Sequence, residues 1–205
     1  MLRRIPTAVL VSGGGTNLQA IIDAAAANRI RHAELALVCA SNPDAYALVR
    51  AERAGIPTAV VSRKAYPDGA AFERELLRVL DEHGIELIVL AGFMTILSAD
   101  FIRRYENRII NVHPSLIPSF CGKGFYGLRV HEAALAYGVK VTGATVHFVN
   151  EIPDGGAIIA QKSVAIRRGD TPETLQRRVM EQAEWRLLPR ALELVALELG
   201  KSEQK

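Results

Sequence analysis

An amide and an imidazole stand two residues apart near the middle of the chain, in the stretch Ile109-Ile110-Asn111-Val112-His113-Pro114. Successive side chains of a strand point to opposite faces of a sheet, so Asn111 and His113 should share one face. Pro114 has no N–H and disfavours the α region for His113, so the strand should end there. Ligands of open α/β sheets bind beyond the carboxyl ends of strands. Either residue alone could be a cap or a satisfied polar group, but the pair predicts a reaction site.

A loop aspartate completes the groups that could do chemistry. Asp154 lies in the turn after the alternating stretch 143–149, where it could also be a simple Asx-turn residue. His147 in that stretch is interpreted as a polar strand residue. The chain has no nucleophile elbow and no paired carboxylates, so a covalent intermediate is not favoured. An amide, an imidazole and a carboxylate suit direct group transfer through a tetrahedral oxyanion, with Asn111 and a protonated His113 stabilising the charge.

A glycine-rich turn follows the first apolar stretch, 7–11. The sequence Ser12-Gly13-Gly14-Gly15-Thr16-Asn17 leads into a helical pattern. Free N–H groups and the positive end of a helix dipole make such a helix start an anion site, and glycines let the ligand approach. Leu18 occupies the third glycine position of a dinucleotide fingerprint, and the Gly-Lys-Ser/Thr of a P-loop is missing. A single phosphate on a sugar is favoured, and a mere tight turn is the alternative.

Apolar runs and helical patterns alternate along the chain. Further strands are predicted over 34–40, 56–61, 86–92, 109–113, 143–149 and 157–165, and helices over 44–54, 71–83, 99–105, 128–137 and from Thr171 onward. This alternation predicts an α/β fold, a mostly parallel twisted sheet flanked by helices. The connection between 143–149 and 157–165 is too short for a crossover, so these two strands should be antiparallel at the sheet's edge.

Several local expectations accompany this fold. The last helix should bend or restart near Pro189, and the charged tail 201–205 should be disordered. His131 is placed on a solvated face of the helix 128–137. The segment 119–127 contains three glycines, aromatic residues and a lysine, and is interpreted as a mobile lid. The oily segment 93–97 could wall a flat ligand or pack under the next helix.

Composition excludes several classes of protein. The chain has 205 residues and a net charge of +3, without a basic run interleaved with aromatics, so a nucleic-acid partner is not expected. Cys39 and Cys121 make no disulfide framework, and neither the cysteines nor the histidines have metal-ligand spacing. No signal-peptide region and no run of about 18 apolar residues is found. We therefore expect a soluble cytoplasmic protein with neither a metal nor a membrane partner.

At this point the motifs resemble a known family, the phosphoribosylglycinamide formyltransferases within the wider folate-dependent formyltransferase group. The matching segments occur in the family's order: Ser12-Gly13-Gly14-Gly15-Thr16-Asn17-Leu18-Gln19-Ala20, Leu90-Ala91-Gly92-Phe93-Met94, Asn111-Val112-His113-Pro114-Ser115-Leu116 and Asp154-Gly155-Gly156. The resemblance covers about residues 6 to 195. It implies transfer of the formyl group of 10-formyltetrahydrofolate, a co-substrate, to the amino group of glycinamide ribonucleotide in de novo purine synthesis.

The resemblance also implies site residues. The catalytic residues would be Asn111, His113 and Asp154; the phosphoribosyl site Gly14, Gly15, Thr16, Asn17 and Glu184; and the folate site Met94, Thr95, Ile96, Leu97, Asn111, Asn150, Glu151, Ile152, Pro153 and Asp154. One domain is expected over 1–205, with a nucleotide-binding half at about 1–100, a folate-binding half at about 101–197 and a tail at 198–205. Either a monomer or a homodimer is compatible with the sequence.

The sequence departs from the family's pattern at three positions, and other functions stay open. Trp185 stands where many members carry histidine, Gly69 lies about where some carry arginine, and Cys121 replaces a common proline. A formyltetrahydrofolate deformylase would usually carry an additional amino-terminal domain, and a methionyl-tRNA formyltransferase a carboxyl-terminal one. A non-catalytic sugar-phosphate sensor would use the glycine turn but would not need the catalytic trio.

Overall fold

The computed structural model describes residues 2–202, and its centre is a seven-stranded sheet in the order β3-β2-β1-β4-β5-β6-β7. The strands are β1 (Ile5–Val11), β2 (Ala33–Ala40), β3 (Thr58–Val60), β4 (Leu87–Leu90), β5 (Ile109–His113), β6 (Val141–Phe148) and β7 (Ile158–Ala165). The strands β1 to β5 are parallel, whereas β6 is antiparallel to both β5 and β7. The predicted α/β fold is confirmed, and of the two antiparallel strands only β7 forms the edge.

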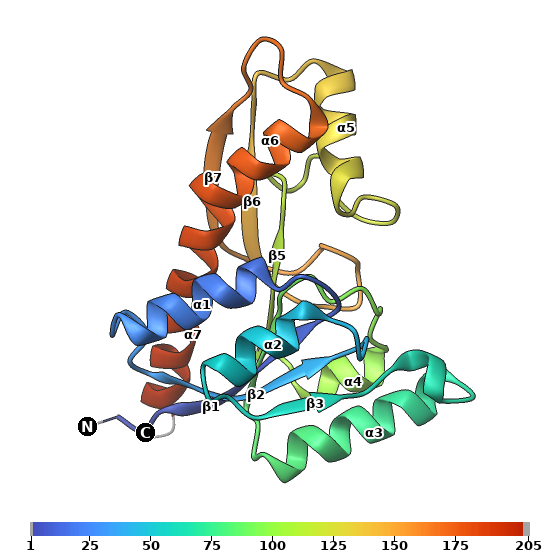
Figure 1. The fold of residues 1–205 in the computed structure, drawn as a ribbon, viewed down its shortest axis with the longest axis vertical. Coiled ribbons are helices and arrows are strands. Elements are labelled where there is room, and N and C mark those ends of the chain that lie inside the picture. The colour runs from blue at the N-terminus through green and yellow to red at the C-terminus, as the bar shows by residue number, and fades with distance from the viewer. Residues whose placement is uncertain (1, 203–205) are drawn as a thin grey trace.

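Helices cover both faces of this sheet (Figure 1). They are α1 (Thr16–Ala26), α2 (Tyr46–Arg53), α3 (Gly69–Glu82), α4 (Ala99–Arg104), α5 (Leu128–Tyr137), α6 (Pro172–Val179) and α7 (Trp185–Ser202). One buried cluster joins α1, α2, α6 and α7 to the sheet, and a second joins α3 and α4 to its other face. Along β1, Val9 and Val11 belong to the first cluster while Ala8 and Leu10 belong to the second. A strand covered on both faces is therefore apolar throughout.

The molecule is elongated, with a narrow middle that we call the waist (Figure 1). The strands β1 to β4 with α1 to α4 lie below it, and α5, α6 and the far ends of β6 and β7 lie above it. The strands β1, β4 and β5 are parallel neighbours, so the carboxyl end of β5 and the turn from β1 into α1 lie at the same edge of the sheet, two strands apart. The two stretches singled out for chemistry and for anion binding are thus brought to one place.

The last helix differs from its prediction. A π-helical segment, Met180–Glu184, separates α6 from α7, and Pro189 lies inside α7 rather than at the break. Pro189 has no N–H to donate to the carbonyl of Trp185. The π-helical segment ends directly before Trp185. Residues 198–202, assigned to a tail, belong to α7 because the buried Gly200 packs against Leu2 and Arg3. The rest of the predicted disordered tail, 203–205, lies outside the described residues.

None of the helices in residues 2–202 combines the length and the apolar character that a membrane crossing requires.

Candidate active site

The strand β5 delivers Asn111 and His113 to the waist, and its pairing with β6 adds a third polar side chain. The register of these antiparallel strands places Asn111 opposite His147 and His113 opposite Thr145. His113 and His147 are 4% and 2% exposed. The sequence analysis treated His147 as an ordinary strand residue. The alternation of 143–149 put His147 and Thr145 on one face, but only the register of the two strands could show which residues they meet.

Asn111 and His147 are held in fixed orientations. The ring Nδ1 of His147 lies 2.8 Å from the carbonyl oxygen of Phe148, which can only accept, so Nδ1 carries a proton. In the neutral ring Nε2 is then an acceptor, and it lies 3.2 Å from Nδ2 of Asn111. The amide of Asn111 therefore directs one N–H at His147 and keeps its second N–H for another acceptor. This fixes the donor that an oxyanion would meet.

Asp154 lies between the two imidazoles. Its carboxylate oxygens are 3.5 Å from Nδ1 of His113 and 3.6 Å from Nε2 of His147, and it accepts the N–H of Gly122 at 2.8 Å. Burial alone would raise the pKa of Asp154, but the neighbouring His147 and His113 and the N–H of Gly122 together lower it. Asp154 is thus an anion at neutral pH, and its charge faces the rings of His113 and His147.

The backbone around Asp154 explains why glycines follow it. Asp154 has a φ of +57°, in the left-handed region that aspartate tolerates better than most residues. A Cβ on Gly156 would lie 1.7 Å from the carbonyl oxygen of Phe148, so this position admits no side chain. The close passage of Gly156 past β6 brings Asp154 back toward the histidines. This tertiary contact, rather than an Asx-turn alone, sets the position of the carboxylate.

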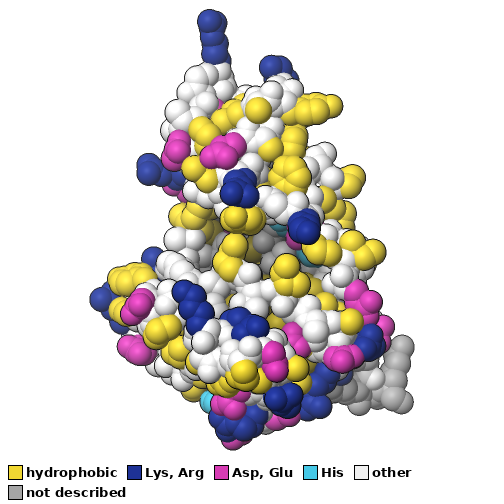
Figure 2. Space-filling model, turned by 90° about the vertical axis from the view of Figure 1, so that its right-hand side faces the viewer, with side chains coloured by type: hydrophobic (Ala, Val, Ile, Leu, Met, Phe, Trp, Pro, Cys, Tyr) yellow, Lys and Arg dark blue, Asp and Glu magenta, His cyan; other side chains and the backbone are white. Residues whose placement is uncertain are grey.

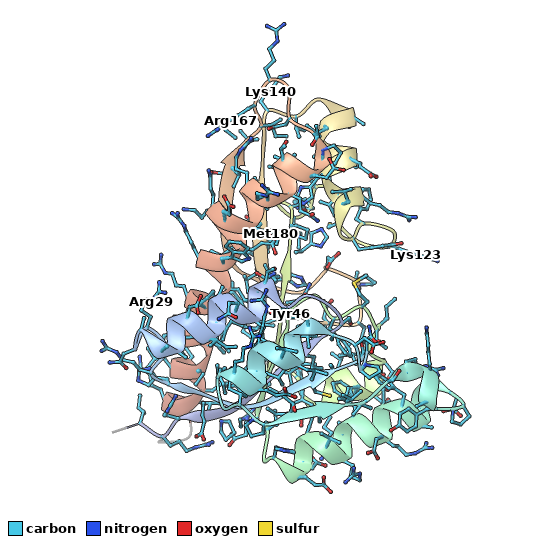
Figure 3. The ribbon with its side chains drawn as sticks, viewed as in Figure 1. Arg29, Tyr46, Lys123, Lys140, Arg167 and Met180 are labelled. Carbon is cyan, nitrogen blue, oxygen red and sulfur yellow. The ribbon has the colours of Figure 1, made fainter. Side chains whose placement is uncertain are left out.

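The segment 119–127 closes over His113. The Nε2 of His113 lies 2.9 Å from the carbonyl oxygen of Phe120, whose φ is +50°. Phe120 packs edge-on against Phe125 and Tyr137, with ring centroids 6.4 and 5.9 Å apart. Lys123, in the middle of this segment and labelled in Figure 3, extends away from the cluster. The contact fits the lid predicted for 119–127, whose mobility stays a prediction.

A cavity of about 160 Å³ opens beside the cluster, between β4, β5 and the loop after β6. It is lined by Leu90, Phe93, Thr95, Ile96, Leu97, Ile102, Asn111, His147, Val149, Asn150, Glu151, Ile152, Pro153 and Asp154. The predicted folate residues are all in this lining except Met94, whose backbone N–H instead bonds Oγ of Ser12. Figure 2 shows histidine and acidic side chains within a hollow flanked by hydrophobic side chains.

The apolar segment 93–97 is divided between the core and the surface, and its role as the wall of a ligand site stays a prediction. Leu97 is buried in the cluster under α4, whereas Ile96 and Met94 are 84% and 59% exposed. Across the cavity Ile152 is 66% exposed. Exposed apolar side chains on both sides of a polar cluster are typical of a binding site for a flat, largely apolar ligand.

The glycine turn is built as an anion site should be. Gly15 is the residue before α1, with a φ of +70°, and a Cβ there would lie 2.6 Å from Cβ of Ala47 on α2. Thr16 begins α1 and lines a cavity of about 260 Å³ together with Gln19, Asp23, Arg29, Arg50 and Trp185. The first N–H groups of α1 lack partners within the helix, and its dipole is positive here.

The π-helical segment 180–184 contacts the glycine turn through Glu184. Glu184 is 6% exposed and accepts the amide N–H of Asn17 at 2.7 Å. Burial raises the pKa of Glu184, although the bond from Asn17 opposes this. The Oδ1 of Asn17 and the Nε1 of Trp185 are buried without a hydrogen-bond partner. Two unpartnered polar atoms beside an anion site are what a polar ligand would satisfy.

One prediction about the histidines is wrong. His131 does not lie on a solvated face but is fully buried, because α5 packs against α6. Neither ring nitrogen has a hydrogen-bond partner. Burial lowers the pKa of His131 to about 4, and the nearby His113 contributes to the shift. Within residues 2–202 no three histidine, cysteine or acidic side chains form a group that could hold a metal ion.

Comparison with known proteins identifies the class. Residues 5–192 match the family model described as Formyl transferase, and the chain belongs to this family.

Particular relatives narrow the family. The chain is 41% identical over 174 residues to the phosphoribosylglycinamide formyltransferase of Escherichia coli, covering 85% of this chain and 79% of that protein. A crystal structure of glycinamide ribonucleotide transformylase 1 from Symbiobacterium toebii superposes with a TM-score of 0.88 at 42% identity, covering 95% of this chain and 89% of that one. The trifunctional purine biosynthetic protein adenosine-3 of Gallus gallus is 48% identical over 193 residues, which is 94% of this chain but only 18% of that protein.

Proposed function

We propose that this formyltransferase transfers the formyl group of 10-formyltetrahydrofolate to the amino group of glycinamide ribonucleotide, in de novo purine synthesis and in the cytoplasm. The observation that carries the proposal is the convergence of Asn111, His113 and Asp154 between an apolar cavity and a glycine-bounded helix start. The names of the bacterial relatives contain the nucleotide substrate and the formyl group, and the family resemblance implies the folate donor. The whole activity of the trifunctional relatives is not implied, since this chain spans 18% of their length.

The folate end of the site is the cavity beside β5. Its apolar walls, Ile96 and Ile152, fit the faces of a flat heterocycle, and the turn 150–154 offers backbone polar groups to its edge. The volume of about 160 Å³ suits the ring of the co-substrate rather than the whole molecule. The formyl carbon would then lie next to Asn111 and His113.

The nucleotide end is the start of α1. The N–H groups of Gly15, Thr16 and Asn17 would bind the phosphate, and Glu184 with Asn17 would meet the ribose. Gly14 supports the turn. Trp185 stands where many family members carry histidine, so its indole N–H replaces an imidazole at this end of the site. With both ends filled, the attacking amine and the formyl carbon meet at the waist.

The chemistry follows from the polar cluster. When the amine attacks, negative charge develops on the formyl oxygen, and the free N–H of Asn111 would stabilise it. The Nε2 of His113 faces the carbonyl oxygen of Phe120, so this contact with the segment 119–127 would have to open before His113 could donate to the oxyanion as well. The carboxylate of Asp154 would stabilise positive charge on His113, so that the imidazole can move the proton that the amine loses. The tetrahedral intermediate then breaks the bond between the formyl carbon and the folate nitrogen, which takes up that proton and leaves as tetrahydrofolate. No covalent enzyme intermediate and no metal is needed.

We further propose that residues 1–205 form a single formyltransferase domain. The half at about 1–100 supplies the phosphate turn, and the half at about 101–197 supplies the catalytic trio and the turn 150–154. Each subsite also takes residues from the other half, namely 90–97 at the cavity and Glu184 at the turn. Whether the domain works as a monomer or as a homodimer does not enter this mechanism.

A formyl-transfer assay tests the proposal. The purified protein is mixed with 10-formyltetrahydrofolate, and tetrahydrofolate release is followed with and without glycinamide ribonucleotide. Release that depends on the nucleotide, with a formylated product, is the expected result. Release of formate without the nucleotide would identify a deformylase, and binding of the nucleotide without any release would identify a sugar-phosphate sensor.

A further inference from the structure

The proposed phosphate site has helix N–H groups but needs a balancing positive charge. A nucleotide phosphate carries about two negative charges at neutral pH. The acid that adjoins the turn, Glu184, would repel it when ionised. On the other side of the turn stands Arg50 of α2, whose Nε donates to the carbonyl of Gly14 at 2.8 Å and whose Nη1 donates to Oε1 of Gln19 at 2.9 Å.

The whole amino-terminal part of α2 is fastened to the glycine turn. The backbone N–H of Ala47 donates to the carbonyl of Gly13 at 3.1 Å, and Gly15 packs so closely on Ala47 that a Cβ would not fit. The guanidinium carbon of Arg50 lies 5.0 Å from the ring centroid of Tyr46, a cation–π contact. Figure 3 labels Tyr46, which begins α2 just below the waist of the molecule.

These bonds determine where the N–H groups of the turn point. In a trans peptide the carbonyl and the following N–H point in opposite directions. The carbonyls of Gly13 and Gly14 are directed at α2 by Ala47 and Arg50, so the N–H groups of Gly14 and Gly15 are directed away from α2. The guanidinium of Arg50 also holds the side chain of Gln19, one turn into α1. Arg50 also lines the cavity that Thr16 and Trp185 share.

We propose that Arg50 is a positioning residue for the phosphate of the nucleotide. Its guanidinium orients the Gly14–Gly15 peptide so that its N–H faces the phosphate, and it provides a permanent positive charge at the turn. The inference rests on the proposed function for the identity of the ligand and goes beyond it in assigning a residue of α2 to the site. Lysine could supply the charge but not the two-pronged contact with Gly14 and Gln19.

Arg50→Met, Arg50→Lys and Arg53→Met test this inference. Arg53 is a matched control because it lies on the same helix and donates to the hydroxyl of Tyr46 rather than to the turn. We expect Arg50→Met to raise the KM for the nucleotide about tenfold or more, with the KM for the folate unchanged and kcat little changed. Arg50→Lys should recover part of the loss, and Arg53→Met should resemble the wild type.

Binding of ribose 5-phosphate, measured by calorimetry, separates this inference from the proposed function. Weaker binding in Arg50→Met than in Arg53→Met supports the role of Arg50, even if the wild type transfers no formyl group. Active wild type with an unchanged nucleotide KM in Arg50→Met would overturn the inference and leave the proposed function standing. A purely structural role would lower the unfolding temperature and the active fraction without separating the two KM values. Should Arg50→Met fail to fold, an unchanged nucleotide KM in Arg50→Lys would overturn the inference instead.

Discussion

The two ends of the proposed site use different atoms. In the proposed function the phosphate turn would bind through the backbone N–H groups of consecutive residues, 15–17, and it depends on glycines that let the chain pass close to α2. The catalytic cluster uses side chains from three separate places, Asn111 and His113 on β5, His147 on β6 and Asp154 in the following loop. A backbone site is sensitive to any added Cβ, and a side-chain site is sensitive to loss of a functional group.

This difference separates binding from turnover. Changes at the turn should mainly alter the KM for the nucleotide, because the turn is remote from the bond that forms. Changes in the cluster should mainly alter kcat, because its groups interact most strongly with charge that appears during the reaction. The two regions are also connected: Oγ of Ser12 accepts the N–H of Met94 at 2.9 Å and shares a hydrogen bond of 2.6 Å with Oγ of Ser41.

The largest effect is predicted for His113→Ala. Removal of the imidazole should lower kcat about a thousandfold, with little change in either KM, because both proton transfer and a donor to the oxyanion are lost. Steady-state kinetics measure this, with His83→Ala as control, since that histidine bonds only the carbonyl of Val79 in its own helix. A His113→Ala enzyme that turns over near the wild-type rate would remove His113 from the mechanism.

A smaller loss is predicted for Asp154→Asn. The variant keeps the shape of the side chain and an oxygen for the N–H of Gly122, but loses the charge between His113 and His147. We expect kcat to fall about a hundredfold. Steady-state kinetics measure this, and an Asp154→Asn enzyme with the wild-type kcat would contradict a role for the charge of Asp154.

A comparison of Gly15→Ala with Gly13→Ala tests the phosphate turn. Gly15 has a φ of +70° and no room for a Cβ, whereas a Cβ on Gly13 would meet no atom within 4 Å. Gly15→Ala should raise the nucleotide KM about tenfold and destabilise the fold by about 1–2 kcal/mol. Gly13→Ala should do neither. Equal KM values for both variants would show that the turn does not position the phosphate.

The pH dependence of stability should reveal His131. Its pKa is about 4 in the folded protein and about 6.5 when exposed, so between these values the unfolded chain binds a proton that the folded chain does not. The free energy of unfolding should therefore fall as the pH drops from 6.5 to 4, by about 1 kcal/mol per pH unit from this residue. Urea titrations at several pH values measure this free energy, and His131→Leu should lack the contribution. Parallel pH profiles of the free energy of unfolding for the two proteins would contradict the role of His131.

The strands and most helices could be predicted from the sequence because their signals are local. Continuous apolar runs marked the parallel strands, the turn Ser12 to Asn17 marked the start of α1, and Thr171-Pro172 marked the start of α6. The short link between β6 and β7 was enough to predict antiparallel pairing. The pattern did not show the π segment 180–184, since an extra residue in a helix turn leaves no local signature.

Residue types and spacing by themselves determined that Asn111 and His113 share the end of a strand and that Gly15 precedes a helix. Which other side chains join them was decided only by the tertiary structure. His147 meets Asn111 because two antiparallel strands adopt one register, and His131 is buried because α5 turns that face toward α6. Asp154 returns to His113 because Gly156 can pass against Phe148. Periodicity reports which face a residue occupies, but the partner of that face is set by packing between segments far apart in the chain.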